Sequence, residues 1–231
     1  ERPEGQKSFF DDFNGLDDFE KKVDFYQHEQ NWSNRLILGD SLLVMTSLAE
    51  KEGLKGQVQM IYLDPPFNSN RSYNVLFRDE SGQEAEAQIT AFEDTWHWNE
   101  SAEATYAELV AGTGGKVGEM IAALRGFIGT NQMMAYLVMM AARLVELHRV
   151  LKPTGSLYLH CDPTASHYLK VVLDAIFGPQ NYLNEVVWKR TSAHNDPNRY
   201  GRVHDTILFY AKDTTSIEFN PVYVPYSREY L

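Results

Sequence analysis

Short apolar runs alternate with helix-like segments between residues 35 and 211, and this alternation constrains the fold more than any other feature. Apolar runs of roughly four to eight residues are typical of buried strands, and longer stretches with apolar residues at helical spacing are typical of helices. The predicted strands cover 35–38, 58–63, 156–160, 185–189 and 206–211, and the predicted helices cover 41–50, 133–151 and 165–177. This order predicts an α/β fold with a mostly parallel sheet and flanking helices.

Two consecutive prolines stop the predicted strand at 58–63. Asp64 follows the strand directly, and Pro65 and Pro66 come next. A central strand cannot continue through them, because proline has no N–H for the ladder. Open α/β sheets bind their ligands at the carboxyl ends of the strands, so Asp64 is a candidate site residue. A proline-rich turn capped by an aspartate is the alternative.

The rest of the chain divides around this point. Residues 1–34 are polar with interleaved aromatic residues and predict an N-terminal extension. Residues 35–231 predict one catalytic domain, with an insertion over 68–131 that is mostly irregular and has short helices near 101–110 and 116–126. A long insertion directly after a strand is more often functional than idle.

Charge and cysteine content narrow the class of protein. The net charge is −11, but the acidity is concentrated before residue 111, and the remainder carries a net charge of +2. The acidity therefore leaves room for a nucleic-acid surface in the second part of the chain. The sequence has neither a transmembrane-length apolar stretch nor a signal-peptide pattern, and a single cysteine fits a reducing cytoplasm. We expect that cysteine, Cys161, to be a small buried hydrophobic residue.

Asp64-Pro65-Pro66-Phe67 has the composition that methyl transfer to an exocyclic amino nitrogen requires. The Asp64 carboxylate can accept one amino hydrogen and the carbonyl of Pro65 the other, which frees the nitrogen lone pair. Pro66 removes a competing N–H donor. Phe67 can stack on a base that has been flipped out of a duplex, which is worth ~1–3 kcal/mol.

The sequence resembles the amino-methyltransferases of restriction–modification systems, which methylate adenine N6 or cytosine N4. The resemblance covers roughly residues 32–231 and is to the permuted branch with the catalytic motif near the N-terminus. It is carried by ordered blocks at 36–42, 61–68, 149–157, 160–164, 184–190 and 204–210. It implies a Rossmann-like methyltransferase sheet, S-adenosylmethionine as the cofactor, double-stranded DNA as the partner and no metal.

The resemblance also assigns roles to individual residues. It implies that Asp64, Pro65, Pro66 and Phe67 are catalytic, and that Asp40, Asp64 and Phe67 contact the cofactor. Asp40 can instead cap the helix that follows it, and the two roles are compatible.

A basic loop over 189–204 predicts DNA contacts, because its cations lie between two strands near the proposed base-flipping site. An ordinary solvated loop is the alternative. The cations in question are Lys189, Arg190, Arg199 and Arg202. A homodimer or a restriction–modification subunit is a further possible partner.

Asp64 favours adenine N6 as the acceptor, since the cytosine-N4 branch of the family more often has serine at this position. Carbon-5 methylation of cytosine needs an attacking cysteine thiolate. It is disfavoured, because the single cysteine, Cys161, lies far from Asp64 in the sequence. Methylation of an RNA base or a protein glutamine, and a non-catalytic DNA-binding remnant, are the remaining alternatives.

The family's glycine-rich cofactor loop has no counterpart in the sequence. In the permuted branch it lies downstream, so we expect it beyond Leu231. We therefore expect the chain to be a fragment with an incomplete cofactor pocket, which binds S-adenosylmethionine weakly and does not turn over.

Overall fold

The computed structural model describes residues 34–67, 71–75, 89–94, 96–112, 115–190, 198, 200–201 and 203–223. The chain divides into two units, Glu1–Asp40 and Ser41–Leu231. In the first unit, residues 34–40 form no helix or strand, and the side chains of Leu36 and Leu38 are fully exposed. The predicted strand at 35–38 is therefore wrong. A strand needs a hydrogen-bonded partner, and none of the described strands pairs with this segment.

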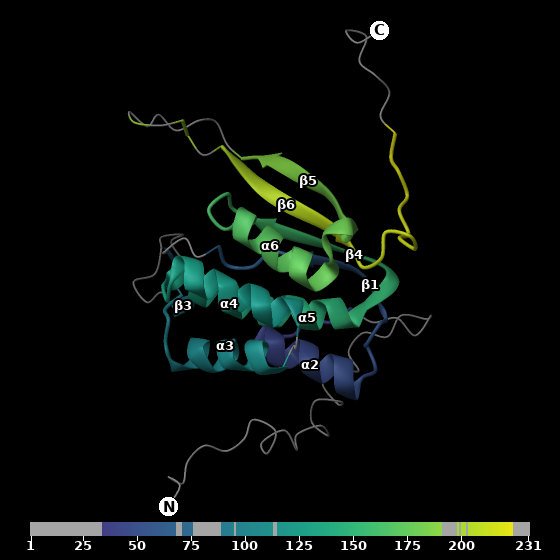
Figure 1. Ribbon diagram of the computed structural model, residues 1–231. Helices are drawn as coiled ribbons and strands as arrows, with labels where there is room; N and C mark the ends of the chain where they lie inside the picture. The colour runs from purple at the N-terminus through teal and green to yellow at the C-terminus, as the bar shows by residue number, and fades with distance from the viewer. Residues whose placement is uncertain are drawn as a thin grey trace, which may run out of the picture. The chain divides into compact units, whose positions relative to one another are not determined.

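The second unit contains a four-stranded sheet in the order β1-β4-β6-β5 (Figure 1). Its strands are β1 (Val58–Leu63), β4 (Leu151–Cys161), β5 (Tyr182–Lys189) and β6 (His204–Ala211). β1 runs parallel to β4, whereas β6 is antiparallel to both β4 and β5. The α/β class is confirmed, but the described sheet is mixed and not mostly parallel. β5 and β6, which follow one another along the chain, pair antiparallel and account for much of this difference.

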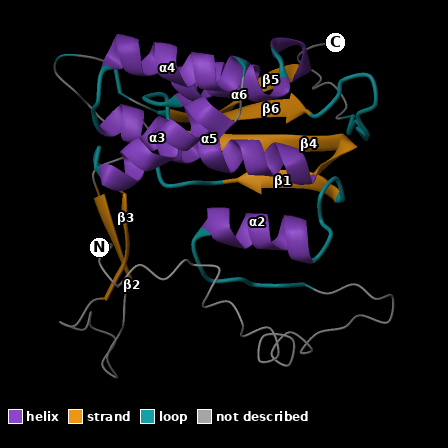
Figure 2. Cartoon of the chain, turned by 60° about the horizontal axis from the view of Figure 1, so that its bottom comes forward, coloured by secondary structure: helices purple, strands orange, loops and turns teal. Residues whose placement is uncertain are grey.

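Two helices cover one face of this sheet, as Figure 2 shows. α5 (Gln132–Val150) and α6 (Ser166–Phe177) confirm the two long predicted helices. Their buried side chains join alternate residues of β4 and β6 in one hydrophobic core. Fully buried members of this core include Tyr136, Leu144, Leu157, Leu169 and Tyr210.

A third predicted helix, α2 (Ser41–Lys51), packs against α5. The Arg143 side chain on α5 donates to the Ser41 hydroxyl at 2.9 Å, and Arg149 pairs with Glu50. None of the described helices is long and apolar enough to span a bilayer.

The described parts of the insertion at 68–131 contain more helix and strand than its polar composition indicates. The predicted helices are present as α3 (Glu100–Gly112) and α4 (Lys116–Ile128), and they pack against each other. The insertion also contains an antiparallel pair, β2 (Arg71–Val75) and β3 (Ile89–Asp94), which the sequence did not predict. β2 is short and mostly polar, and the apolar residues of β3 do not alternate regularly, so neither strand has the pattern that identifies a buried strand. Between the helices, Arg125 forms a bidentate ion pair with Glu103, at 2.8 and 2.9 Å.

The chain passes from α5 directly into β4, and the start of β4 is irregular. Val58 of β1 pairs with Leu151, but Met60 pairs with Ser156, so residues 152–155 form a bulge. The predicted turn after α5 is thus built into the strand. The Gln59 side chain holds the bulge through two hydrogen bonds to Thr154, at 2.9 and 3.1 Å. The register of β1 against β4 beyond this point is regular up to Leu63 and Leu159.

Candidate functional site

Asp64 lies immediately beyond the carboxyl end of β1, as the sequence predicted. Along β1 the side chains of Met60 and Tyr62 are more than half exposed, and Ile61 and Leu63 pack against the core. Strand alternation therefore places Asp64 on the exposed face. Its side chain is 58% exposed, so the carboxylate is accessible to a substrate.

The proline loop continues from Asp64 without regular secondary structure, and Pro65, Pro66 and Phe67 are half-buried. Neither proline offers an N–H, so the loop presents mainly carbonyl oxygens. The arrangement is compatible with an acceptor pair formed by the Asp64 carboxylate and the Pro65 carbonyl.

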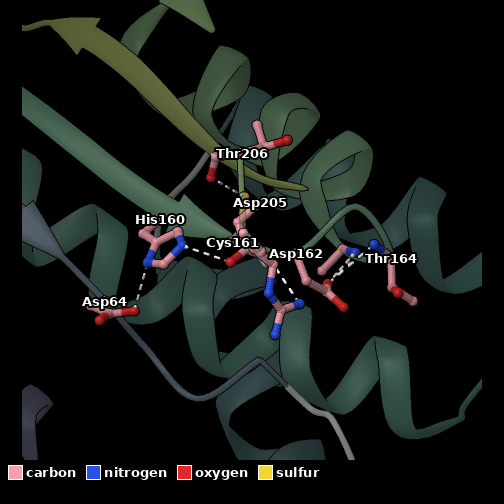
Figure 3. Close-up of polar contacts among 9 residues, drawn as sticks. Asp64, His160, Cys161, Asp162, Thr164, Asp205 and Thr206 are labelled. Carbon is pink, nitrogen blue, oxygen red and sulfur yellow. Dashed lines mark hydrogen bonds and ion pairs between the residues drawn. The ribbon is translucent and has the colours of Figure 1, made fainter. Parts of the chain in front are cut away.

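His160 on β4 contacts both ends of this loop. Its Nδ1 lies 3.0 Å from Oδ1 of Asp64 (Figure 3). Its ring lies edge-on to Phe67, with 5.0 Å between the ring centroids. The contact follows from the sheet register, because Leu63 pairs with Leu159 and the next residue of each strand is Asp64 or His160. An ionised carboxylate can only accept hydrogen bonds, so Nδ1 of His160 is the donor.

Asp205 of β6 lies on the other side of the histidine ring. Its Oδ2 is 3.4 Å from Nε2 of His160, and its Oδ1 is 3.3 Å from Nη1 of Arg190. The Asp205 side chain is only 7% exposed, and these two contacts supply the positive and polar groups that a buried carboxylate requires. Among the described residues, Nε2 of His160 and Oδ1 of Asp205 are buried without a hydrogen bond of good geometry.

These side chains meet because of how the strands are directed. One end of the sheet contains the carboxyl ends of β1, β4 and β5 and the amino end of β6. At this end of the strands four side chains lie in one row, which we call the site row: Asp64, His160, Asp205 and Arg190.

Cys161 faces away from the site row, into the core. Its side chain is fully buried, and its thiol lies 3.6 Å from the carbonyl of Thr206. Burial, with nearby carboxylates, raises the pKa of the Cys161 thiol to about 12. The prediction of a buried small hydrophobic residue is confirmed, and the thiol is unsuited to nucleophilic attack because the thiolate is the reactive form.

The neighbouring Asp162 has a local role. Its Oδ1 accepts hydrogen bonds from the backbone N–H groups of Thr164 and Ala165, at 3.1 and 3.2 Å. These bonds satisfy donors at the start of α6, as a helix cap does.

The remaining predicted residues are less fully described. Lys189 ends β5 and Arg190 follows it, both exposed, whereas Arg199 and Arg202 lie outside the described residues. Asp40 is exposed and directly precedes α2, and its cofactor contact stays a prediction. Within the described part of the chain, no three histidine, cysteine or acidic residues form a metal-binding group.

Sequence reasoning assigned no role to His160 and Asp205. Both belong to blocks that carry the family resemblance, and both lie at a predicted strand end. The missing information was the strand order, since only the pairing of β4 with both β1 and β6 brings them beside Asp64.

The described residues form an α/β sheet that presents an accessible carboxylate and a proline loop at a strand's carboxyl end, which is where open α/β sheets bind their ligands. A family model described as DNA methylase, for the N6 and N4 methyltransferases, matches residues 58–229. The chain therefore belongs to the N6/N4 DNA methylase family, which confirms the resemblance seen in the sequence.

The relatives of this chain include subunits of restriction–modification enzymes. It is 26% identical over 190 residues to the EcoP15I Mod subunit, a type III enzyme of Escherichia coli, covering 81% of this chain and 26% of that protein. It is 28% identical over 184 residues to the StyLTI Mod subunit of Salmonella typhimurium, covering 79% and 24%. With the type II methyltransferase M.EcaI of Enterobacter cloacae it shares 32% identity over 92 residues, covering 39% and 20%. The chain spans about a quarter or less of the length of these relatives.

Proposed function

We propose that the protein transfers a methyl group from S-adenosylmethionine to an exocyclic amino group in DNA, with N6 of adenine as the acceptor. Family membership supports the reaction class. The observation that carries the proposal is the accessible Asp64 carboxylate, followed by Pro65 and Pro66, at the carboxyl end of β1.

In this proposal Asp64 and the Pro65 carbonyl each accept one hydrogen of the amino group. The two acceptors draw the nitrogen away from planarity and leave its lone pair directed at the methyl group. Methyl transfer would form a carbon–nitrogen bond and break the carbon–sulfur bond of the donor, whose sulfur would leave as a neutral thioether. The Asp64 carboxylate or water would take the proton that the methylated nitrogen then loses. Phe67 stacks on the flipped base, which recovers part of the cost of flipping.

The residues present fit the cofactor at its reactive end. S-adenosylmethionine, when bound, supplies a methyl group on a positively charged sulfur. The exposed negative charge of Asp64 is favourable beside such a cation. Asp64 and Phe67 would hold this end, and Asp40 would hold the adenosine end.

We propose that DNA phosphates contact the basic loop. Lys189 and Arg190 are exposed at the same end of the strands as Asp64, and Arg199 and Arg202 follow in the same loop of the sequence. One guanidinium can serve two acceptors, because arginine has five donors in a fork. Arg190 can thus bind a phosphate and still pair with Asp205.

The relatives are named as Mod subunits of type III restriction–modification enzymes, and these names support a place for this protein in such a system. We propose that it works there in the cytoplasm with a partner subunit. The preference for adenine over cytosine N4 rests on the aspartate at position 64, according to the family pattern.

The decisive experiment is Asp64→Ala in the full-length protein. We expect methyl incorporation into duplex DNA, followed with radiolabelled cofactor, to be abolished while the thermal melting curve is unchanged. Chromatography of the hydrolysed DNA identifies the product, and methylcytosine in place of methyladenine would correct the acceptor.

Glu108→Ala is the matched control, because Glu108 is an exposed acid on α3 with no role in the site. We expect it to keep full activity. Substantial transfer by a folded Asp64→Ala protein would refute the mechanism, and an inactive parent that still binds DNA would favour a non-catalytic DNA-binding protein.

A further inference from the structure

We propose that His160 is a positioning residue that orients the Asp64 carboxylate, and that Asp205 holds the histidine ring in place. This inference rests on the proposed function. It is carried by one juxtaposition: the two ring nitrogens of His160 face two carboxylates from different strands, at 3.0 Å and 3.4 Å.

The first step concerns the freedom of Asp64. The terminal torsion of an aspartate is broad, and a carboxylate that is 58% exposed can rotate in water. Donation from Nδ1 of His160 fixes Oδ1, so that Oδ2 remains available in a defined direction for the substrate amino hydrogen. His160 thereby removes a rotation that would otherwise oppose a productive geometry.

The second step concerns the histidine ring. A flip of the ring about its terminal torsion would exchange Nδ1 for a carbon and break the bond to Asp64. Asp205 opposes this flip, because its Oδ2 lies 3.4 Å from Nε2 and the flip would put a ring carbon in place of that nitrogen beside the carboxylate. The edge contact with Phe67 restricts the same motion, and Arg190 balances the charge of Asp205.

Kinetics of His160 variants test the proposal in the full-length protein. We expect His160→Ala to lower kcat about tenfold with an unchanged KM for DNA, the effect of losing one charge-assisted hydrogen bond at a partly exposed site. His160→Asn keeps an N–H donor close to the position of Nδ1, so we expect it to restore most of the lost rate. A merely structural role would change melting temperature and KM together, and equal losses in the two variants would overturn the proposal.

The effect should also depend on Asp64. In an Asp64→Asn background, we expect His160→Ala to cost clearly less than tenfold, because the carboxylate that it orients is gone. A full tenfold loss in that background would show that His160 acts on something else.

A spectroscopic measurement tests the contact independently of activity. We expect nitrogen NMR of the His160 ring to show a protonated Nδ1, whose signal moves in Asp64→Ala and responds to Asp205→Asn. An unprotonated Nδ1 in the parent protein would overturn the proposal.

Failure of this inference is distinguishable from failure of the proposed function. If Asp64→Ala abolishes transfer and the His160 variants are as active as the parent, only the positioning role fails. If Asp64→Ala remains active, the proposed function itself fails.

Discussion

Replacing Gly155 with alanine tests the bulge that sets the register between β1 and β4. A Cβ added at Gly155 would lie 3.0 Å from the Gln59 carbonyl oxygen, from the Lys152 carbonyl oxygen and from a methyl carbon of Leu151. Two of these atoms belong to the backbone and cannot rotate away. The surrounding backbone must therefore give by a few tenths of an ångström to accept the methyl group.

The expected cost follows from this crowding. Overpacking by a methyl group costs about 1–3 kcal/mol, and replacing glycine with alanine regains about 0.4–1 kcal/mol by restricting the unfolded chain. We expect the free energy of unfolding to fall by about 1–2 kcal/mol, which lowers the melting temperature by about 2–8 °C for a chain of this size.

Gly126→Ala is the matched control. Gly126 lies inside α4, and a Cβ there meets nothing within 4 Å. The same added methyl group should stabilise the protein by about 0.5–1 kcal/mol, the difference in helix preference between the two residues. Calorimetric melting of both variants decides the matter, and a Gly155→Ala protein that melts at or above the parent would refute the packing argument.

Three further predictions concern pH, salt and core packing. Burial, helped by the charge of Lys212, lowers the pKa of His148 from 6.5 to about 4, so the unfolded state binds this proton more readily. The free energy of unfolding should therefore fall by about 1 kcal/mol between pH 7 and pH 5, after allowing for partial exposure of the ring. Urea titrations should show that His148→Gln removes this dependence, and an identical pH dependence in the variant would contradict it. Neutralising the four cations of the basic loop should lower the slope of log affinity for DNA against log salt by about 0.9 per lost phosphate contact. Lys55→Gln, before the amino end of β1, should leave that slope unchanged, and an unchanged slope in the loop variant would mean an ordinary solvated loop. Leu144→Ala should cost about 2–5 kcal/mol in denaturant titrations, because Leu144 is fully buried in α5, and a loss below 1 kcal/mol would contradict its place in the core.

Local sequence patterns predicted the elements that have strong apolar periodicity. α5, α6 and β1 were predicted within a residue or two at each end, since their apolar residues recur at helical spacing or form an unbroken run. The segment at 35–38 has an equally good apolar run but forms no strand. An apolar run does not indicate whether a neighbouring strand is available for pairing. The β2–β3 pair was missed for the opposite reason. These two strands have no clear apolar run, and each is identified as a strand only by its pairing with the other.

The sequence predicted which residue lies at the end of β1, but not which residues of other strands lie beside it. Asp64 is marked by the prolines beside it, so its place beyond β1 could be read directly from the sequence. His160 ends one predicted strand and Asp205 directly precedes another, and nothing local indicates that β4 lies between β1 and β6. Arg190 was predicted to face DNA, and its additional pairing with a buried acid depends on the same strand order.

The parallel pairing of β1 with β4 has a consequence for folding and for local opening. Asp64 and His160 are separated by 96 positions in the chain, so their contact closes a long loop and costs more conformational entropy to form than a local contact does. β1 is also at one edge of the described sheet, and edge elements open at a lower free-energy cost than the core. Fraying of β1 alone would separate Asp64 from His160 while α5, β4 and β6 stay packed. The geometry of the site is therefore less stable than the fold that carries it, and hydrogen exchange at the amides of β1 would measure the difference.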